Sequence, residues 1–196
     1  MLELREFAVV FTGVSVYEAK DGPARFMRLS DLSDLKAGRT PILARGEVPA
    51  VARALKIEEG DLIIGARGSA TDICVASDAV FGAFVSLDLY LVRPNRVRVN
   101  PQYLVAFLSL PATQALFAGG KQGSGLARLA KDALEKTEVP LPPMHVQRLI
   151  AGLALSFEEE NKLLKRLTDL NSVIAREAVA RAIRAADTHF STRSTQ

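Results

Sequence analysis

A run of prolines followed by a long apolar-periodic segment constrains this chain more than any other feature. The sequence Pro-Leu-Pro-Pro at residues 140–143 stands before a segment that reaches about Ala186 without another proline. Proline is tolerated in the first turn of a helix, because the amide hydrogen that it lacks would have no partner there. The sequence therefore predicts a mixed domain over residues 1–142, one long helix over residues 143–188 and a frayed tail over residues 189–196.

Apolar residues recur every three or four positions along the segment after the prolines, which is the pattern of a coiled-coil helix. The residues expected to face a partner are Ile150, Leu153, Phe157, Leu164, Leu167, Asn171 and Ile174. About 42 residues at ~1.5 Å each give a rod of roughly 60 Å, which a domain of about 140 residues cannot cover. We therefore expect a second copy or a partner protein to cover the helix. A helical hairpin is the alternative, but the only break, Gly152, lies too early for one.

Ahead of the prolines, short apolar and β-branched runs alternate with turn residues, as in a mixed α+β domain. Gly13 is expected to break or bulge the first strand, and Ser30 to cap a turn or single helical turn that ends at Leu35. Strands are predicted over residues 5–16, 25–29, 62–64, 71–76 and 80–92, helices over residues 102–109, 111–117 and 126–136, and a basic loop over residues 36–47. Residues 139–141 are expected to form a last short strand or an extended strap. The fold class is therefore an α+β (α/β) head followed by one long C-terminal coiled-coil helix.

The overall charge permits nucleic acid as a partner without demanding it. The net charge is +3, and a slightly basic protein without a nucleic-acid partner fits equally well. One cysteine, Cys74, excludes an internal disulfide and suits a reducing compartment. No run approaches the ~18 apolar residues that a membrane span needs. The first residues also lack a signal-peptide pattern, so we expect a cytoplasmic protein with no membrane partner.

Catalytic motifs are incomplete in this sequence. Residues 100–103, Asn-Pro-Gln-Tyr, resemble the Asn-Pro-Pro-Tyr motif of amino-methyltransferases, but the second proline and a Gly-rich cofactor turn are missing. Residues 119–125 are glycine-rich without the Walker spacing, so a phosphate-binding loop and a plain flexible loop both stay open. His145 and His189 are poorly placed for a catalytic triad, and Cys74 is expected to be buried and inert. Metal-ligand spacing is absent as well, so we expect no enzyme activity, no cofactor and no metal.

Three polar and basic patches are candidates for contact with nucleic acid. Arg67 lies between Gly65 and Gly68 at the end of a strand, where a guanidinium group can project toward guanine or a phosphate. The alternative is an exposed turn arginine with no ligand. Loops on a rigid scaffold commonly carry recognition residues. The candidate DNA-binding residues of this first patch are Arg67 and Ser69. Those of the second patch are Lys121, Gln122, Ser124 and Arg128, and those of the third are Arg39 and Arg45.

Several segments, in order along the chain, resemble the specificity subunit of type I restriction-modification systems. The segments similar to the family's first strand, Asp-Leu segment, Gly-Asp strand and Pro-x-Tyr-Leu helix start are residues 11–13 (FTG), 25–35 (RFMRLSDLSDL), 59–64 (EGDLII) and 100–104 (NPQYL). The most recognisable signature lies in residues 123–151, where Gly-Ser-Gly precedes Val-Pro-Leu-Pro-Pro and Gln147. The family's usual acidic residue before this glutamine is replaced by Val146.

This resemblance implies a target recognition domain that binds double-stranded DNA, followed by a long helix. Full-length members carry two such domains and two helices that pack antiparallel. DNA methyltransferase (modification) subunits, in some systems with a restriction subunit, assemble on this scaffold and supply the chemistry. One domain and one helix correspond to half of the arrangement, so the resemblance implies a homodimer with antiparallel helices that reads a split DNA site.

Two other functions compete with non-catalytic DNA recognition. A protein-binding coiled-coil scaffold with incidental DNA affinity would bind its partner tightly and show no preference among DNA sequences. A degenerate methyltransferase would bind S-adenosylmethionine, and the missing cofactor turn is the sequence feature against it. The basic loops and the ordered family motifs favour DNA recognition over both.

Overall fold

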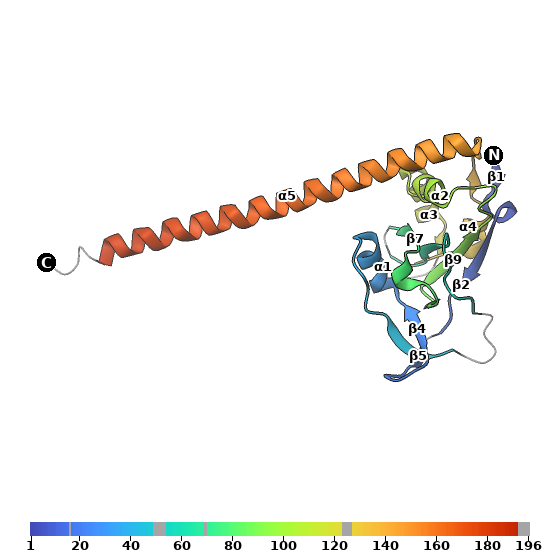
Figure 1. Cartoon of the computed structure of the whole chain (residues 1–196), viewed down its shortest axis with the longest axis horizontal. Coiled ribbons are helices and arrows are strands. Elements are labelled where there is room, and N and C mark those ends of the chain that lie inside the picture. The colour runs from blue at the N-terminus through green and yellow to red at the C-terminus, as the bar shows by residue number, and fades with distance from the viewer. Residues whose placement is uncertain (16, 49–53, 69, 123–126, 192–196) are drawn as a thin grey trace. The chain divides into compact units, whose positions relative to one another are not determined.

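The computed structural model describes residues 1–15, 17–48, 54–68, 70–122 and 127–191, with the backbone alone for residues 122 and 185–191. The chain divides into two compact units, Met1–Ala154 and Leu155–Gln196. The strands are β1 (Leu2–Glu3), β2 (Ala8–Thr12), β3 (Tyr17–Glu18), β4 (Ala24–Met27), β5 (Ala44–Glu47), β6 (Leu62–Gly65), β7 (Ile73–Val75), β8 (Phe84–Val85), β9 (Leu89–Pro94), β10 (Lys121–Gln122), β11 (Arg128–Leu129) and β12 (Glu138–Val139). The helices are α1 (Leu29–Lys36), α2 (Pro101–Leu108), α3 (Pro111–Gly119), α4 (Lys131–Glu135) and α5 (Met144–Ser191), with 3₁₀ turns η1 (Leu4–Glu6) and η2 (Asp78–Val80). The predicted mixed head followed by one long helix is confirmed (Figure 1).

Strand β9 is the centre of the first unit. It pairs antiparallel with β2 on one side and with β6 on the other, in the sheet order β2-β9-β6-β7. Successive side chains of a strand point to opposite faces of the sheet. Leu89 and Leu91 accordingly join one hydrophobic cluster, and Tyr90 and Val92 join another. The sheet therefore separates two cores, and this explains why β9 is apolar at four successive positions.

Different helices cover the two faces of this sheet. The larger core takes side chains from α2, α3, α4 and the first turns of α5, including Leu104, Phe117, Leu134 and Ala151. The smaller core takes side chains from α1, such as Leu32. A second sheet, in the order β3-β5-β4-β8, encloses a third cluster in which the Phe26 and Phe84 rings lie 5.8 Å apart. In Figure 1, β4 and β5 lie at the lower end of this unit and α2 lies at its upper end.

The prediction of one strand over residues 80–92 is wrong, because the chain changes sheets within that segment. Strand β8 pairs in parallel with β4 of the second sheet, whereas β9 belongs to the central sheet. The turn at residues 86–88 makes the crossing, and Gly82, at φ +77°, allows the tight bend ahead of β8. Both halves are apolar, so the alternation along the sequence runs on without marking the change of partner.

Other predicted elements need smaller corrections. The loop expected over residues 36–47 ends in strand β5, which pairs with β3 and β4. The helix expected over residues 126–136 is reduced to α4, because residues 128–129 form β11 opposite β10. The N-cap of α1 is Arg28 rather than Ser30: the backbone N–H of Arg28 donates to Asp31 at 2.8 Å. The strand predicted over residues 5–16 is reduced to β2, which begins at Ala8 after the turn η1. The strands predicted over residues 25–29, 62–64 and 71–76 correspond to β4, β6 and β7, and the helices after Asn100 and Leu110 are confirmed. Of the segment 139–141, only Val139 lies in a strand, β12.

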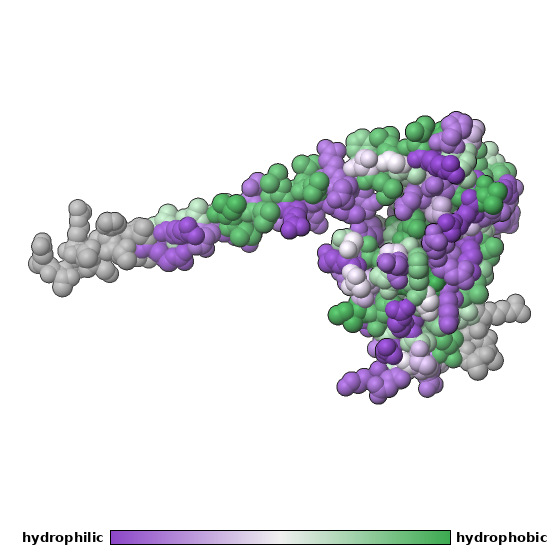
Figure 2. All heavy atoms as spheres, viewed as in Figure 1, coloured by the Kyte–Doolittle hydropathy of each residue, from purple (hydrophilic) through white to green (hydrophobic). Residues whose placement is uncertain are grey.

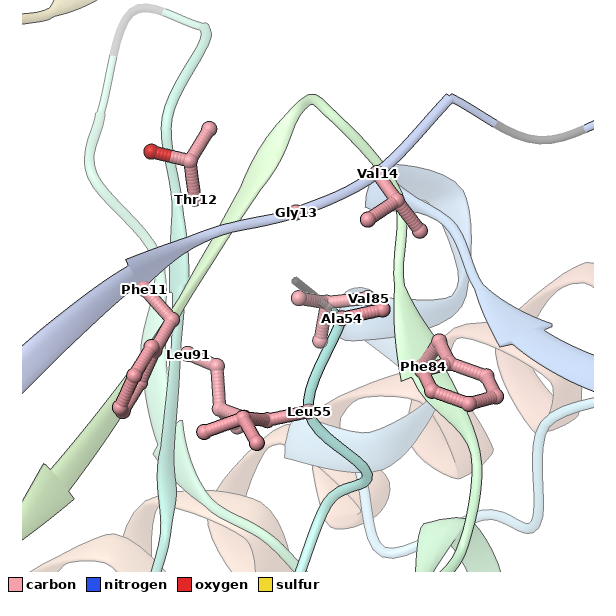
Figure 3. A pocket seen from close by; sticks show the side chains of 9 residues that line it. All are labelled: Phe11, Thr12, Gly13, Val14, Ala54, Leu55, Phe84, Val85 and Leu91. Atoms are coloured by element: carbon pink, nitrogen blue, oxygen red, sulfur yellow. The ribbon is translucent and has the colours of Figure 1, made fainter. Parts of the chain in front are cut away.

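Gly13 allows the two sheets to meet closely. A Cβ atom at this position would lie 1.9 Å from the carbonyl oxygen of Ser86, so only glycine fits. Beside this contact lies a small cavity of about 10 Å³, which Figure 3 shows from close by. Its lining residues are Phe11, Thr12, Gly13, Val14, Ala54, Leu55, Phe84, Val85 and Leu91. A space of this size holds at most one water molecule, so it is a packing defect and not a ligand site.

The first turns of α5 are tied into the head by one buried amide. Gln147 is 1% exposed. Its Oε1 accepts from the backbone N–H of Asn100 at 2.8 Å, and its Nε2 donates to the carbonyl oxygens of Pro142, at 2.9 Å, and Arg98, at 3.2 Å. The side chain of Gln147 therefore joins three chain segments: the start of α2, the proline run and α5 itself.

Tyr103 makes a second link at this joint. Its hydroxyl donates to the carbonyl oxygen of Pro140 at 2.6 Å, and burial raises the pKa of Tyr103 above its ordinary value. The hydroxyl therefore keeps its proton and stays a donor at neutral pH. Ala151, one turn after Gln147, is 4% exposed and belongs to the larger core. The head therefore includes the beginning of the long helix.

We predict that Gln147→Ala lowers the free energy of unfolding by about 2–3 kcal/mol, because it leaves buried polar groups of the backbone without partners. Chemical denaturation followed by circular dichroism measures this change. The partly exposed Gln102 of α2 provides the matched control, and Gln102→Ala is expected to change stability by less than about 0.5 kcal/mol. Equal losses in the two variants would show that the amide of Gln147 is not a tie between head and helix.

Candidate nucleic-acid interface and exposed helix

The loop between β6 and β7 brings two of the predicted DNA-binding arginines together. Arg67 follows the end of β6 and forms an isolated antiparallel bridge with Arg128 of β11. The backbone N–H of Leu129 donates to the carbonyl oxygen of Ala66 at 2.8 Å and fixes the register of this contact. Lys121 of β10 reaches the same loop, where its Nζ donates to the carbonyl oxygen of Gly68 at 2.6 Å. We call Arg67, Lys121 and Arg128 the arginine cluster.

The guanidinium group of Arg128 is held against an aromatic ring. Its Cζ lies 5.2 Å from the ring centroid of Tyr90, and its Nε is 3.3 Å from the Tyr90 hydroxyl oxygen. That hydroxyl in turn donates to the carbonyl oxygen of Leu129 at 2.7 Å. A cation over an aromatic face is both stabilised and oriented. Arg128 thus presents a positioned charge.

Arg67 has a carboxylate partner. Its Nε lies 2.6 Å from Oδ1 of Asp88, and the two side chains are 36% and 45% exposed. Asp88 is the last residue before β9, and its carbonyl oxygen accepts from the backbone N–H of Ala66 at 2.8 Å. The ion pair therefore closes the end of the β6–β9 strand pair, at the surface.

The loop that carries Arg67 is braced from two further sides. The side-chain amide of Gln114 in α3 both accepts from the N–H and donates to the carbonyl oxygen of Thr71, each at 3.1 Å. Lys36, in the last turn of α1, forms an ion pair with Asp72. Gly68 takes φ +105°, a conformation that favours glycine. This bracing suits a loop whose side chains must be presented in fixed positions.

The other predicted cations do not join the arginine cluster. Arg39 lies after α1, where its Nε and Nη2 contact Oδ1 of Asp34 at 2.9 and 2.6 Å. Arg45 lies on β5 opposite Arg25 of β4. It lines an open groove with Glu18, Ala19, Lys20, Arg28, Ile42, Leu43 and Ala44. Ser69 and Ser124 are outside the described residues, and so is the side chain of Gln122.

Sequence patterns did not identify several neighbours of the candidate residues. Asp88 lies beside Arg67, and Tyr90 lies beside Arg128. Lys20 and Arg28 line the same groove as Arg45. Tyr90 and Asp88 fall within the apolar alternation of residues 80–92, which indicates which side chains share a face but not which residues they contact. Lys20 lies in a turn, and Arg28 precedes α1, with no local signal of these neighbours at either position. Each neighbour relation arises from strand pairing between distant segments.

A second set of charges stands at the opposite end of the β6–β9 pair. Asp61, which is 1% exposed, accepts from Nε and Nη2 of Arg93, each at 2.8 Å. Hydrogen bonding to Asp61 raises the pKa of Arg93 further above its ordinary value. Arg96 pairs with Glu59 at 3.1 Å, with both side chains exposed. The pair between Arg93 and the buried Asp61 holds the strand ends together and leaves Arg93 little freedom to bind a ligand.

Asn100 acts as a helix cap. Its side-chain oxygen accepts from the backbone N–H of Tyr103 at 3.0 Å, with Pro101 in the first turn. The expectation that this motif opens a helix is confirmed. Cys74 on β7 is partly exposed, so the expectation that it is buried is wrong; β7 is an edge strand of its sheet. Across the described residues, no cluster of three His, Cys, Asp or Glu side chains is arranged to hold a metal ion.

The second surface of interest is the long helix. From Leu155 to Arg184, nearly every described side chain of α5 is exposed, and Figure 2 shows hydrophobic patches along it. The predicted partner-facing residues are all exposed: Ile150, Leu153, Phe157, Leu164, Leu167, Asn171 and Ile174. Leu163, Leu170, Val173, Val179 and Ile183 are each more than half exposed as well. Soluble helices rarely leave a stripe of this size open to water. In the described part of the chain, neither α5 nor another helix carries an apolar stretch that would cross a bilayer.

Three solved structures share this fold. One comes from a study of complex assembly and conformational transition of the type I R-M system, with TM-score 0.62 and 20% identity over 85% of this chain and 40% of that one. The HsdS subunit from Thermoanaerobacter tengcongensis has TM-score 0.58 and 22% identity over 85% and 38%. The type I S subunit from M. genitalium has TM-score 0.56 and 11% identity over 87% and 41%. The chain thus spans about two fifths of the length of these proteins.

The family comparison covers most of the chain. No curated protein sequence matches it significantly. The profile of the type I restriction modification DNA specificity domain matches residues 23–170, a range that includes β4, the arginine cluster and the first half of α5. The resemblance seen in the ordered motifs is confirmed. The chain belongs to the type I restriction-modification DNA specificity family, whose members are non-catalytic.

Proposed function

We propose that this chain reads a split double-stranded DNA site as a homodimer and docks DNA methyltransferase subunits, with the head contacting DNA and α5 pairing with a second copy. The observation that carries the DNA part is the backbone bridge between Arg67 and Arg128, which brings cations from two hairpins together. Family membership supports the same function.

The chemistry of the arginine cluster suits duplex DNA. Guanidinium groups form paired hydrogen bonds with phosphate oxygens or with O6 and N7 of guanine. Arg128 is already oriented by Tyr90, so little side-chain freedom would be lost on binding. Lys121 contacts the same β6–β7 loop through Gly68 and would add a charge for phosphate contact. Arg39 and Arg45, which lie away from this cluster, would serve as outlying phosphate contacts.

The exposed stripe on α5 supports self-association. A helix of 48 residues is about 72 Å long at ~1.5 Å per residue, which corresponds to roughly 20 base pairs. Two copies paired antiparallel would cover each other's apolar stripes and place identical heads under twofold symmetry, as a split inverted repeat requires. Asn171 within the stripe would help to fix the register.

Methyltransferase subunits, with or without a restriction subunit, would supply the chemistry. The chain itself would need no cofactor. A protein-binding scaffold with incidental DNA affinity is the second candidate, and the exposed stripe on α5 is the observation that favours it. Methylation mapping of a genome with and without this chain separates the two, because only a specificity subunit would leave a defined motif unmodified when it is removed.

We predict that Arg128→Gln weakens binding to a mixed-sequence DNA duplex by about tenfold and makes the dependence of log K on log salt shallower by about one, because one phosphate contact is lost. Fluorescence anisotropy between about 50 and 200 mM KCl measures both quantities. Arg96→Gln is the matched control, because Arg96 lies at the opposite end of the same strand pair. Equal losses in the two variants would indicate non-specific attraction to the whole head.

We further predict that the chain is a dimer and that Leu167→Glu converts it to a monomer, because the new charge would be placed within the apolar stripe. Light scattering coupled to size exclusion measures the molar mass. Lys165→Glu, on the opposite side of the helical wheel, is expected to leave the dimer intact. A wild-type chain that stays monomeric at micromolar concentration would exclude self-pairing through α5.

A further inference from the structure

The ion pair between Arg67 and Asp88 lies within the candidate interface, and DNA binding alone does not explain why a carboxylate is placed there. A DNA-reading arginine is expected to be available, yet Arg67 is 2.6 Å from a carboxylate in the free protein. We infer that Asp88 is a specificity-determining residue that competes with DNA for Arg67 and keeps this arginine from binding DNA of arbitrary sequence. This inference rests on the proposed function and assigns a role to a residue outside the arginine cluster.

The position of Asp88 is fixed by the backbone and not by the ion pair. Its carbonyl oxygen accepts from Ala66, one residue before Arg67, and Gly65 lies opposite Leu89 in the β6–β9 pair. The carboxylate therefore stays within reach of Arg67 whether or not the pair is formed. A tethered partner of this kind acts at a high effective concentration, so a phosphate in solution or on a loosely bound duplex competes poorly with it.

The pair contributes little to folding. Both side chains are more than one-third exposed, and exposed ion pairs add little to stability. Its presence at the candidate interface is therefore better explained by an effect on binding. A carboxylate beside an incoming phosphate is repulsive, and a repulsive group directed against wrong partners is a common source of specificity. Only a duplex that offers Arg67 well-placed acceptors, such as O6 and N7 of guanine, would displace Asp88.

The carboxylate of Asp88 would remain in a solvated environment after its displacement from Arg67. Asp88 lines an open groove that Arg28 lines as well. Arg28 on the wall of this groove already contacts Glu18 at 3.3 Å and Asp31 at 3.7 Å. A carboxylate released by Arg67 would therefore stay in water, near another cation, and would not be buried without a partner.

The same strand pair supplies a matched control at its opposite end. Arg96 and Glu59 are 3.1 Å apart and exposed, and they lie beyond the far ends of β9 and β6. Glu59→Gln changes the net charge by the same amount as Asp88→Asn. The two variants differ in which arginine they release, and therefore separate a specific effect on Arg67 from a general gain in positive charge.

The test is a double-mutant cycle in which the affinity of each variant for a mixed-sequence duplex is measured. Fluorescence anisotropy between about 50 and 200 mM KCl gives this affinity and its salt dependence. We expect Asp88→Asn to bind about two- to tenfold more tightly than wild type and to steepen the salt dependence by about one, as Arg67 gains a phosphate contact. Arg67→Gln alone should change little, and should abolish the gain when combined with Asp88→Asn. Asp88→Glu keeps the charge and should behave as wild type.

Three results would overturn the inference. The first is a gain in DNA affinity on Asp88→Asn that is no larger than the gain on Glu59→Gln. The second is a gain on Asp88→Asn that persists when Arg67→Gln is also present. The third is an equal gain in affinity on Asp88→Glu. Thermal unfolding of each variant checks that the fold is retained, which the backbone contacts of residue 88 favour. If wild-type protein binds the duplex and Asp88→Asn leaves binding unchanged, the role of Asp88 fails alone. If neither protein binds, the proposed DNA function fails with it.

Discussion

The two-sided burial of β9 is the constraint on which the rest of the head depends. Its even-numbered and odd-numbered side chains belong to different cores, so the strand has no face left for solvent. Residues at its two ends are the first that can be polar, and near both ends lie arginine–carboxylate pairs with residues that flank the neighbouring strand β6. These ion pairs thus lie at the two ends of the β6–β9 pair, where its buried positions stop.

Local signals in the sequence predicted the elements that have a strong pattern of their own and whose formation does not depend on which strand lies beside them. The proline run and the spacing of apolar residues predicted the long helix, and Asn100 with Pro101 predicted the start of α2. The split of residues 80–92 between two sheets was not predictable, because apolar alternation does not indicate which strand lies beside it. Strand β11 was missed for a related reason, since its only signal is the partner β10.

The candidate interface was predictable as a set of residue types but not as a site. Arg67, Lys121 and Arg128 were identified by their basic character and glycine-rich surroundings, and they do lie together. Arg39 and Arg45 were identified in the same way and do not join them. What decides membership is the pairing of the β10–β11 hairpin with the β6–β7 loop, a contact between segments about sixty residues apart. The contact of Arg128 with Tyr90 depends on the same pairing, whereas the contact of Arg67 with Asp88 depends on the pairing of β6 with β9.

The buried amide of Gln147 has a consequence for how heads can be exchanged between related proteins. Because Gln147 and Ala151 belong to the interior of the head, the proline run is not a boundary at which the polypeptide can be cut and rejoined freely. A chimaera spliced at Pro143 would combine the helix start of one parent with the α2 start of another, and would depend on a chance match between them. A junction placed after Ala154 keeps each head with the helical turns that complete it.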